Sequence, residues 1–87
     1  MTYRVELTGA ARETLVHLPP AVKQEVKAAL RYLAQNPRGG EPLRRELLGK
    51  WKFRIARYRL IYQIYPQDRR LLVVAIGPRR DIYEKPL

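Results

Sequence analysis

The stretch WKFRIARYRL at residues 51–60 decides the fold of this chain, because its apolar and polar side chains alternate. Trp51 and Phe53 fall on one face of an extended strand, whereas Lys52 and Arg54 fall on the other. A strand with one apolar face is typical of a sheet that helices cover on one side only. We therefore predict a strand here and interpret Trp51 as a core residue, with stacking on a nucleic-acid base as the alternative.

Two further runs extend this sheet toward the C-terminus. Residues 58–65 alternate in the same way and end at Pro66-Gln67-Asp68, a turn signal. Residues 71–76 are apolar on both faces, which predicts the most central strand of the sheet. Because short turns join the three runs, we expect them to form an antiparallel meander.

The N-terminal half predicts one strand and a helical hairpin. Residues 3–7 alternate as a strand, which has to pair with an edge of the sheet. Thr8 can cap a first helix, and Pro20 can open a second, which Asn36-Pro37 ends. The apolar faces of the two helices comprise Ala11, Leu15 and Leu18, and then Val22, Val26, Ala29, Leu30 and Leu33.

These elements predict an α+β fold in the order β-α-α-β-β-β. The helical hairpin is expected to pack on one face of a four-stranded, mainly antiparallel sheet, and residues 37–49 are expected to form the only long loop. At 87 residues the chain is long enough for one core, so we predict a single domain over residues 1–87.

The charge of the chain points to a polyanionic partner. Residues 38–87 hold thirteen Lys or Arg and five Asp or Glu, against five and three in residues 1–37. A positive field confined to one half steers polyanions, of which nucleic acid is the commonest. Cysteine is absent, which excludes disulfides and thiolate chemistry, and the charged N-terminus without a long apolar run predicts a cytoplasmic protein that does not enter a membrane.

Basic residues gather on the sheet face that the helices leave uncovered. We predict a basic floor of surface side chains, with Tyr83 as an aromatic neighbour; its members are Lys52, Arg54, Arg57, Arg59, Arg79 and Arg80. Guanidinium groups bind phosphate oxygens bidentately, and a tyrosine ring stacks on an unpaired base. The pattern therefore favours single-stranded RNA over duplex DNA as the ligand.

The same residues suit RNA cleavage without a metal or cofactor. When the ribose 2′-hydroxyl attacks the adjacent phosphorus, negative charge builds on the phosphate, and preorganised cations stabilise that charge. The single histidine, His17, falls on the first helix, so we interpret it as an exposed helix residue rather than a catalytic one. Glu46, in the basic loop, is either a charge partner or a base. No His, Asp and Glu cluster has metal-ligand spacing, and Gly39-Gly40 lacks the context of a phosphate loop.

In combination, several of these strings resemble the RelE/ParE toxin superfamily over nearly the whole chain. They are Asn36-Pro37, the run from Leu47 to Ile55 (LLGKWKFRI), Tyr58-Arg59-Leu60-Ile61-Tyr62, Ile76-Gly77-Pro78-Arg79, and Tyr83. The resemblance implies the RelE-like microbial RNase fold. It also implies the toxin of a type II toxin-antitoxin system, which in the RelE branch cuts messenger RNA in the ribosomal A site.

The resemblance assigns roles to individual residues. It implies that Lys52 and Arg54 activate the 2′-hydroxyl or bind phosphate, and that Arg59 stabilises the phosphate in the transition state. Arg79 matches the catalytic arginine that follows the apolar strand in the family, and Tyr83 matches the tyrosine that stacks on or orients the substrate base. A lysine or arginine with a lowered pKa would then act as the general base. We assign further RNA contacts to the surrounding basic residues, which are Arg44, Arg45, Lys50, Arg57 and Arg80.

We therefore expect a metal-independent endoribonuclease that depends on the ribosome. Its implied partners are messenger RNA, ribosomal RNA and an acidic antitoxin protein that forms a hetero-oligomer with it and blocks the basic surface. Two alternatives stay open. One is a ParE-like inhibitor that binds DNA gyrase without chemistry, and the other is a noncatalytic RNA-binding module.

Overall fold

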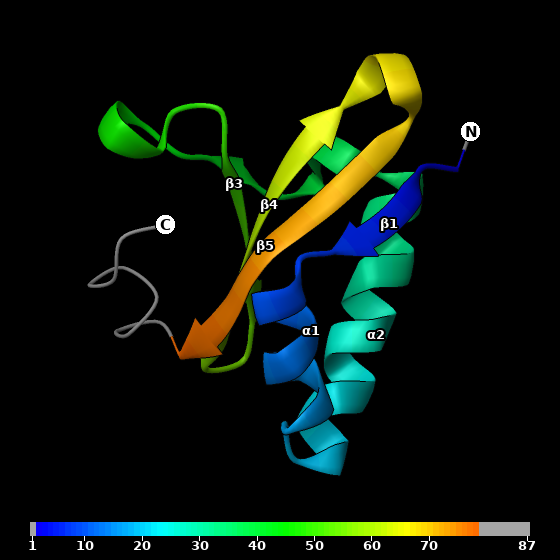
Figure 1. Cartoon of the computed structure of the whole chain (residues 1–87), viewed down its shortest axis with the longest axis vertical. Helices are drawn as coiled ribbons and strands as arrows, with labels where there is room; N and C mark the ends of the chain where they lie inside the picture. Colours follow the sequence, from blue (N-terminus) through cyan, green and yellow to red (C-terminus); the bar gives the residue numbers. More distant parts are fainter. Residues whose placement is uncertain (1, 79–87) are drawn as a thin grey trace.

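The computed structural model describes residues 2–78 of the chain, and Figure 1 shows a sheet with both helices on one side. The strands are β1 (Arg4–Leu7), β2 (Glu41–Pro42), β3 (Trp51–Ile55), β4 (Tyr58–Tyr65) and β5 (Arg70–Pro78). The helices are α1 (Gly9–Val16) and α2 (Pro20–Gln35), and three short 3₁₀ turns are η1 (Pro37–Gly39), η2 (Arg45–Leu47) and η3 (Pro66–Asp68). The predicted α+β order of these elements is confirmed.

Within residues 2–78 the sheet has five strands, one more than predicted, in the order β1-β5-β4-β3-β2. β1 pairs with β5 in parallel, and the other three pairings are antiparallel, as the predicted meander requires. Two details of the prediction are wrong. The stretch 37–49 is not only a loop, because Glu41 and Pro42 form an extra strand, which is too short to show alternation in the sequence. Consequently β4, and not the more apolar β5, is the middle strand.

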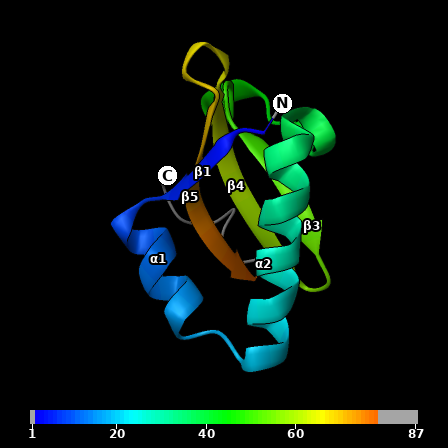
Figure 2. The same ribbon diagram turned by 90° about the vertical axis from the view of Figure 1, so that its right-hand side faces the viewer.

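Local sequence signals fix both helices. The Thr8 side chain accepts a hydrogen bond from the Ala11 backbone N–H, so it caps α1 as predicted. Pro20 occupies the first position of α2, where a missing N–H costs nothing, and Asn36 caps its end. Figure 2 shows the two helices side by side in front of β4 and β5. Their apolar faces therefore cover one side of the sheet, which we call the inner face.

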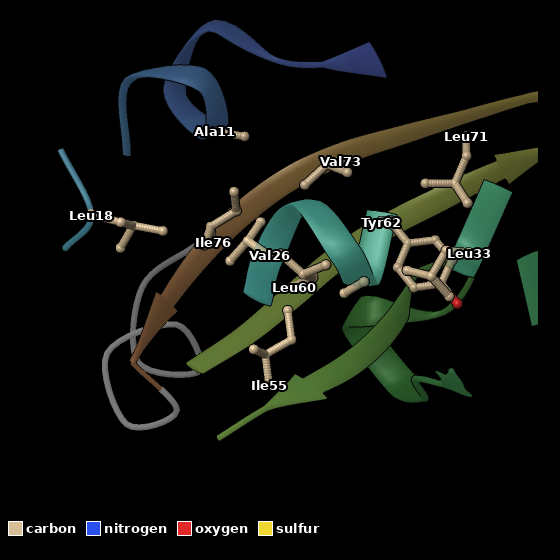
Figure 3. Packing of buried hydrophobic residues seen from close by; sticks show 11 residues of the cluster. Ala11, Leu18, Val26, Leu33, Ile55, Leu60, Tyr62, Leu71, Val73 and Ile76 are labelled. Carbon is tan, nitrogen blue, oxygen red and sulfur yellow. The ribbon is translucent and has the colours of Figure 1, made fainter. Parts of the chain in front are cut away.

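The hydrophobic core lies between the helices and the inner face (Figure 3). On the strands, Leu60 and Tyr62 of β4 are fully buried, and Leu71 and Val73 of β5 lie beside them. Trp51 packs at the margin of this cluster, stacked on the Tyr62 ring with 6.4 Å between centroids. The interpretation of Trp51 as a core residue is therefore confirmed.

A buried tyrosine ties the segment after α2 to the sheet. The Tyr62 hydroxyl donates to the Pro37 carbonyl at 2.8 Å and accepts from the Gly40 N–H at 3.1 Å. Gly40 itself lies so close to the Lys52 backbone that a side chain there would collide with the Lys52 carbonyl. These contacts hold β2 against the part of β3 that carries Lys52.

Replacing this tyrosine should loosen the fold. In Tyr62→Phe the Pro37 carbonyl and the Gly40 N–H lose their shared partner in a partly buried place, so we expect a loss of about 1–3 kcal/mol in the free energy of unfolding. Denaturant titration measures it. Tyr3→Phe is the matched control, because the Tyr3 hydroxyl makes no hydrogen bond within the described residues. Equal stabilities of the two variants would contradict this account.

The same hydroxyl should make stability depend on alkaline pH. Burial raises the pKa of Tyr62 above its ordinary value of 10.0, because the charged form would lose its hydration. Above the ordinary value the unfolded chain gives up this proton while the folded chain keeps it, so folding stability falls as pH rises through the folded-state pKa. The stability advantage of the wild type over Tyr62→Phe should therefore be constant below pH 9 and shrink above about pH 10; an unchanged advantage would argue against it.

Candidate functional site

Three of the predicted site residues lie together on the outer face of the sheet, the face away from the helices. Since Leu60 and Tyr62 point into the core, alternation places Arg59 on the outer face. Arg54 of β3 is the direct cross-strand partner of Arg59, and Lys52 lies two residues before Arg54 on the same face. We call Lys52, Arg54 and Arg59 the basic cluster.

Arg59 is not the surface residue that the sequence predicts. Only 5% of it is exposed, although it lies on the face away from the helices. Its guanidinium Nη1 donates to the Tyr58 carbonyl at 3.3 Å, and within residues 2–78 no carboxylate pairs with it. A buried cation without a carboxylate partner favours the binding of an anion.

Small and apolar residues surround the basic cluster. Ile61, the partner of Lys52 across the sheet, is fully buried although it points away from the main core. On the other side of β4, Gly77 pairs with Arg59 and adds no side chain there. On the edge strand, Glu41 pairs with Lys52, so a carboxylate that the sequence reasoning missed lies on the same strand ladder.

The remaining predicted residues fall into two groups. Arg57 is exposed in the turn between β3 and β4, next to the basic cluster. Arg44 and Arg45 are exposed and Lys50 half-buried in the loop 43–50, which a hydrogen bond from the Leu43 N–H to the Lys50 carbonyl closes. This loop projects from the sheet on the side away from the helices (Figure 1). Arg79, Arg80 and Tyr83 lie outside the described residues, and their predicted roles stay predictions.

The other candidates show little sign of chemistry. His17 is exposed at the end of α1, where Nδ1 lies 2.9 Å from the Glu13 carbonyl, so its interpretation as a helix residue is confirmed. Glu46 is exposed in η2 and forms no ion pair in the part of the chain that the structure describes. Within residues 2–78 no group of three or more metal-ligating side chains occurs, and none of the helices there is long and apolar enough to cross a membrane.

A second group on the outer face was missed by the sequence reasoning. The Arg70 guanidinium lies over the Tyr65 ring, with 4.5 Å between Cζ and the ring centroid. Arg70 Nη1 also contacts Glu6 Oε1 at 3.1 Å, and Arg4 Nε contacts Glu6 Oε2 at 3.1 Å. The Tyr65 hydroxyl donates to Gln63 at 3.0 Å. The sequence of the turn η3 does not indicate that Tyr65 pairs with Arg70; only the pairing of β4 with β5 shows it.

The basic cluster can bind a phosphate and stabilise charge on it, because three cations converge from two paired strands. The described residues offer no histidine there, so proton transfer would fall to a basic side chain or to the substrate itself. Such an arrangement fits a reaction whose nucleophile belongs to the ligand.

Sequence comparisons relate this chain to known proteins. The sequence model of the family described as "ParE toxin of type II toxin-antitoxin system, parDE" matches residues 5–83. The chain is similar to Toxin RelG of Mycobacterium tuberculosis, with 38% identity over 98% of this chain and 100% of that protein.

Solved structures resemble this chain as well. One is the RelBE2 toxin-antitoxin complex of M. tuberculosis, with a TM-score of 0.83 and 33% identity over 91% of this chain and 93% of that chain. Another is the intact RelBE toxin-antitoxin complex of E. coli, with a TM-score of 0.77 and 22% identity over 87% of this chain and 95% of that chain; this likeness shows the fold alone.

Two like charges face each other in the basic cluster, and removing one should stabilise the fold. Arg54→Glu turns the repulsion from Arg59 into attraction, so we expect a gain of about 0.2–1 kcal/mol in the free energy of unfolding, larger at low salt. Melting curves at two salt concentrations test this. Arg57→Glu, in the adjacent turn, makes the same charge change without a cross-strand partner. A gain no greater than that of Arg57→Glu would show that the repulsion is unimportant.

Proposed function

The chain belongs to the RelE/ParE superfamily of type II toxins, and from this premise we propose that it is an endoribonuclease that cleaves messenger RNA on the ribosome. Cleavage proceeds by attack of the ribose 2′-hydroxyl on the adjacent phosphorus, with departure of the 5′-oxygen. The observation that carries the proposal is the convergence of Lys52, Arg54 and Arg59 on one sheet face. Arg79 and Tyr83, outside the described residues, are proposed to complete the site.

The roles of the cluster follow from its geometry. Arg59, buried and without a carboxylate partner in residues 2–78, stabilises the charge that develops on the phosphate. Its low exposure strengthens this effect, because an electrostatic interaction is stronger where water is excluded. Lys52 and Arg54 bind the phosphate from β3, and one of them takes the proton of the 2′-hydroxyl.

The exposed cations around the cluster serve binding. Arg44, Arg45 and Lys50 on the loop 43–50, together with Arg57, attract the RNA backbone and the ribosomal RNA. Arg80 is proposed to act in the same way. The toxin-antitoxin complexes among its structural relatives support an antitoxin as the protein partner, and acidic side chains on that antitoxin would cover the basic cluster.

Cleavage of programmed ribosomes tests the proposal. Arg59→Gln keeps much of the side-chain volume but removes the charge, so we expect a loss of about 100-fold or more in the cleavage rate. Arg31→Gln is the matched control, because Arg31 is exposed on α2 and its loss lowers the net charge equally. Thermal melting of both variants separates catalysis from folding, which matters because Arg59 is buried.

A gyrase inhibitor is the second candidate, because the matching family model describes ParE toxins. A supercoiling assay with purified gyrase distinguishes the two functions. If the wild-type chain blocks supercoiling and leaves ribosome-bound message intact, the endoribonuclease proposal is wrong. If folded Arg59→Gln cuts message as fast as the wild type, the assignment of Arg59 is wrong.

A further inference from the structure

We propose that Tyr65 and Arg70, called here the stacked pair, form a second RNA subsite that binds the base of an unpaired nucleotide. The base lies against the face of the Arg70 guanidinium that points away from the Tyr65 ring. This inference rests on the proposed function, since it takes RNA as the ligand of the outer face. The basic cluster and the stacked pair would then bind one RNA strand at two points.

The stacked pair is held in place before any ligand arrives. Tyr65 and Arg70 are direct cross-strand partners, and the guanidinium lies 4.5 Å from the ring centroid. Glu6 binds Arg70 Nη1 at 3.1 Å from one side, and Gln63 accepts the Tyr65 hydroxyl hydrogen bond at 3.0 Å from the other. A flat group that is already immobilised loses little conformational entropy when a base stacks on it.

Glu6 lowers the positive charge around the stacked pair. Its carboxylate contacts both Arg4 and Arg70 at 3.1 Å, so two guanidinium groups share one carboxylate. Arg59, in contrast, has no carboxylate partner within residues 2–78. The Arg70 side chain is 31% exposed, and arginine planes are common stacking surfaces for unpaired bases.

The two sites lie on one strand and on one face. Arg59 and Tyr65 are both on β4, six positions apart, so their side chains point to the same side. Six residues of strand correspond to about 20 Å, a length that a few nucleotides of single-stranded RNA span. Ile61, which is fully buried, and Gln63 lie between them on this face. The basic cluster and the stacked pair therefore lie along one strand and on the same face.

Binding measurements with two polyanions test the subsite. The probes are an oligouridine of about 12 nucleotides and an inorganic polyphosphate, which has charge but no bases. Arg70→Lys keeps the charge and removes the flat guanidinium, so we expect about a tenfold weaker affinity for the oligouridine and unchanged affinity for polyphosphate. Fluorescence anisotropy at low salt measures the first, and its competition by polyphosphate measures the second.

Arg4→Lys is the matched control, because Arg4 also contacts Glu6 but does not stack on Tyr65. It should bind both probes like the wild type. Tyr65→Leu removes the ring beneath the guanidinium and should weaken oligouridine binding in the same selective way. Melting curves establish that each variant is folded, and the two stacked-pair variants together keep the test decisive if one of them does not fold.

The outcomes separate this inference from the proposed function, because binding is measured without cleavage. A folded Arg70→Lys or Tyr65→Leu variant that binds oligouridine as tightly as the wild type overturns the subsite, whether or not message is cut. An equal loss of affinity for both probes also overturns it, since charge alone would then explain the effect. If the variants lose affinity for oligouridine alone and the wild-type chain does not cut message, the subsite is supported and the endoribonuclease proposal is wrong.

Discussion

The pairing of β4 with both of its neighbours is the constraint on which the rest of this structure depends. β4 is the middle strand, and its side chains alternate between the core and the outer face. A slip of one residue in its register would move Leu60 and Tyr62 out of the core and Arg59 into it. The position of the basic cluster is therefore fixed by core packing rather than by the conformation of a loop.

This arrangement carries a cost in stability. Arg54 and Arg59 face each other across the strands, and Arg59 is largely buried without a carboxylate partner in residues 2–78. Neither feature stabilises the fold, because like charges repel and a buried cation loses hydration. The helices on the inner face offset both, since they bury Leu60 and Tyr62 directly behind the cluster. Burial of the apolar side chains on the inner face of β4 thus offsets the cost of the charged side chains on its outer face.

Alternation and capping were enough to predict most of the fold. The apolar positions of residues 51–65 gave the inner face of β3 and β4, and Thr8 and Pro20 gave the starts of both helices. The two residues of β2 were not predictable, because their place depends on the hydroxyl of Tyr62, a contact between distant residues. The strongly apolar sequence of β5 also led to the wrong prediction that it is the most central strand. Apolar character does not indicate how many strands lie beyond β4.

The site was likewise predictable only in part. Alternation assigned Lys52, Arg54 and Arg59 to one face. It does not indicate how far each side chain on that face is buried, so the burial of Arg59 was missed. The stacked pair was missed for a different reason. Which residue of β5 faces Tyr65 depends on the length of η3, and alternation does not give this length.

The length of β1 explains why the two ends of the outer face differ in charge. β1 has four residues and pairs only with residues 70–73 of β5, so its carboxylate, Glu6, lies beside Arg70. The other end of β5, where Gly77 faces Arg59, extends beyond β1 and has no strand residue to supply an acid on that side. At the β1 end, Glu6 offsets part of the charge of Arg4 and Arg70, which suits a flat group, while the Arg59 end receives no acid from β1 and suits a phosphate. A longer first strand with the same alternation would place further side chains beside the second half of β5, and an acidic one among them would weaken the field at Arg59.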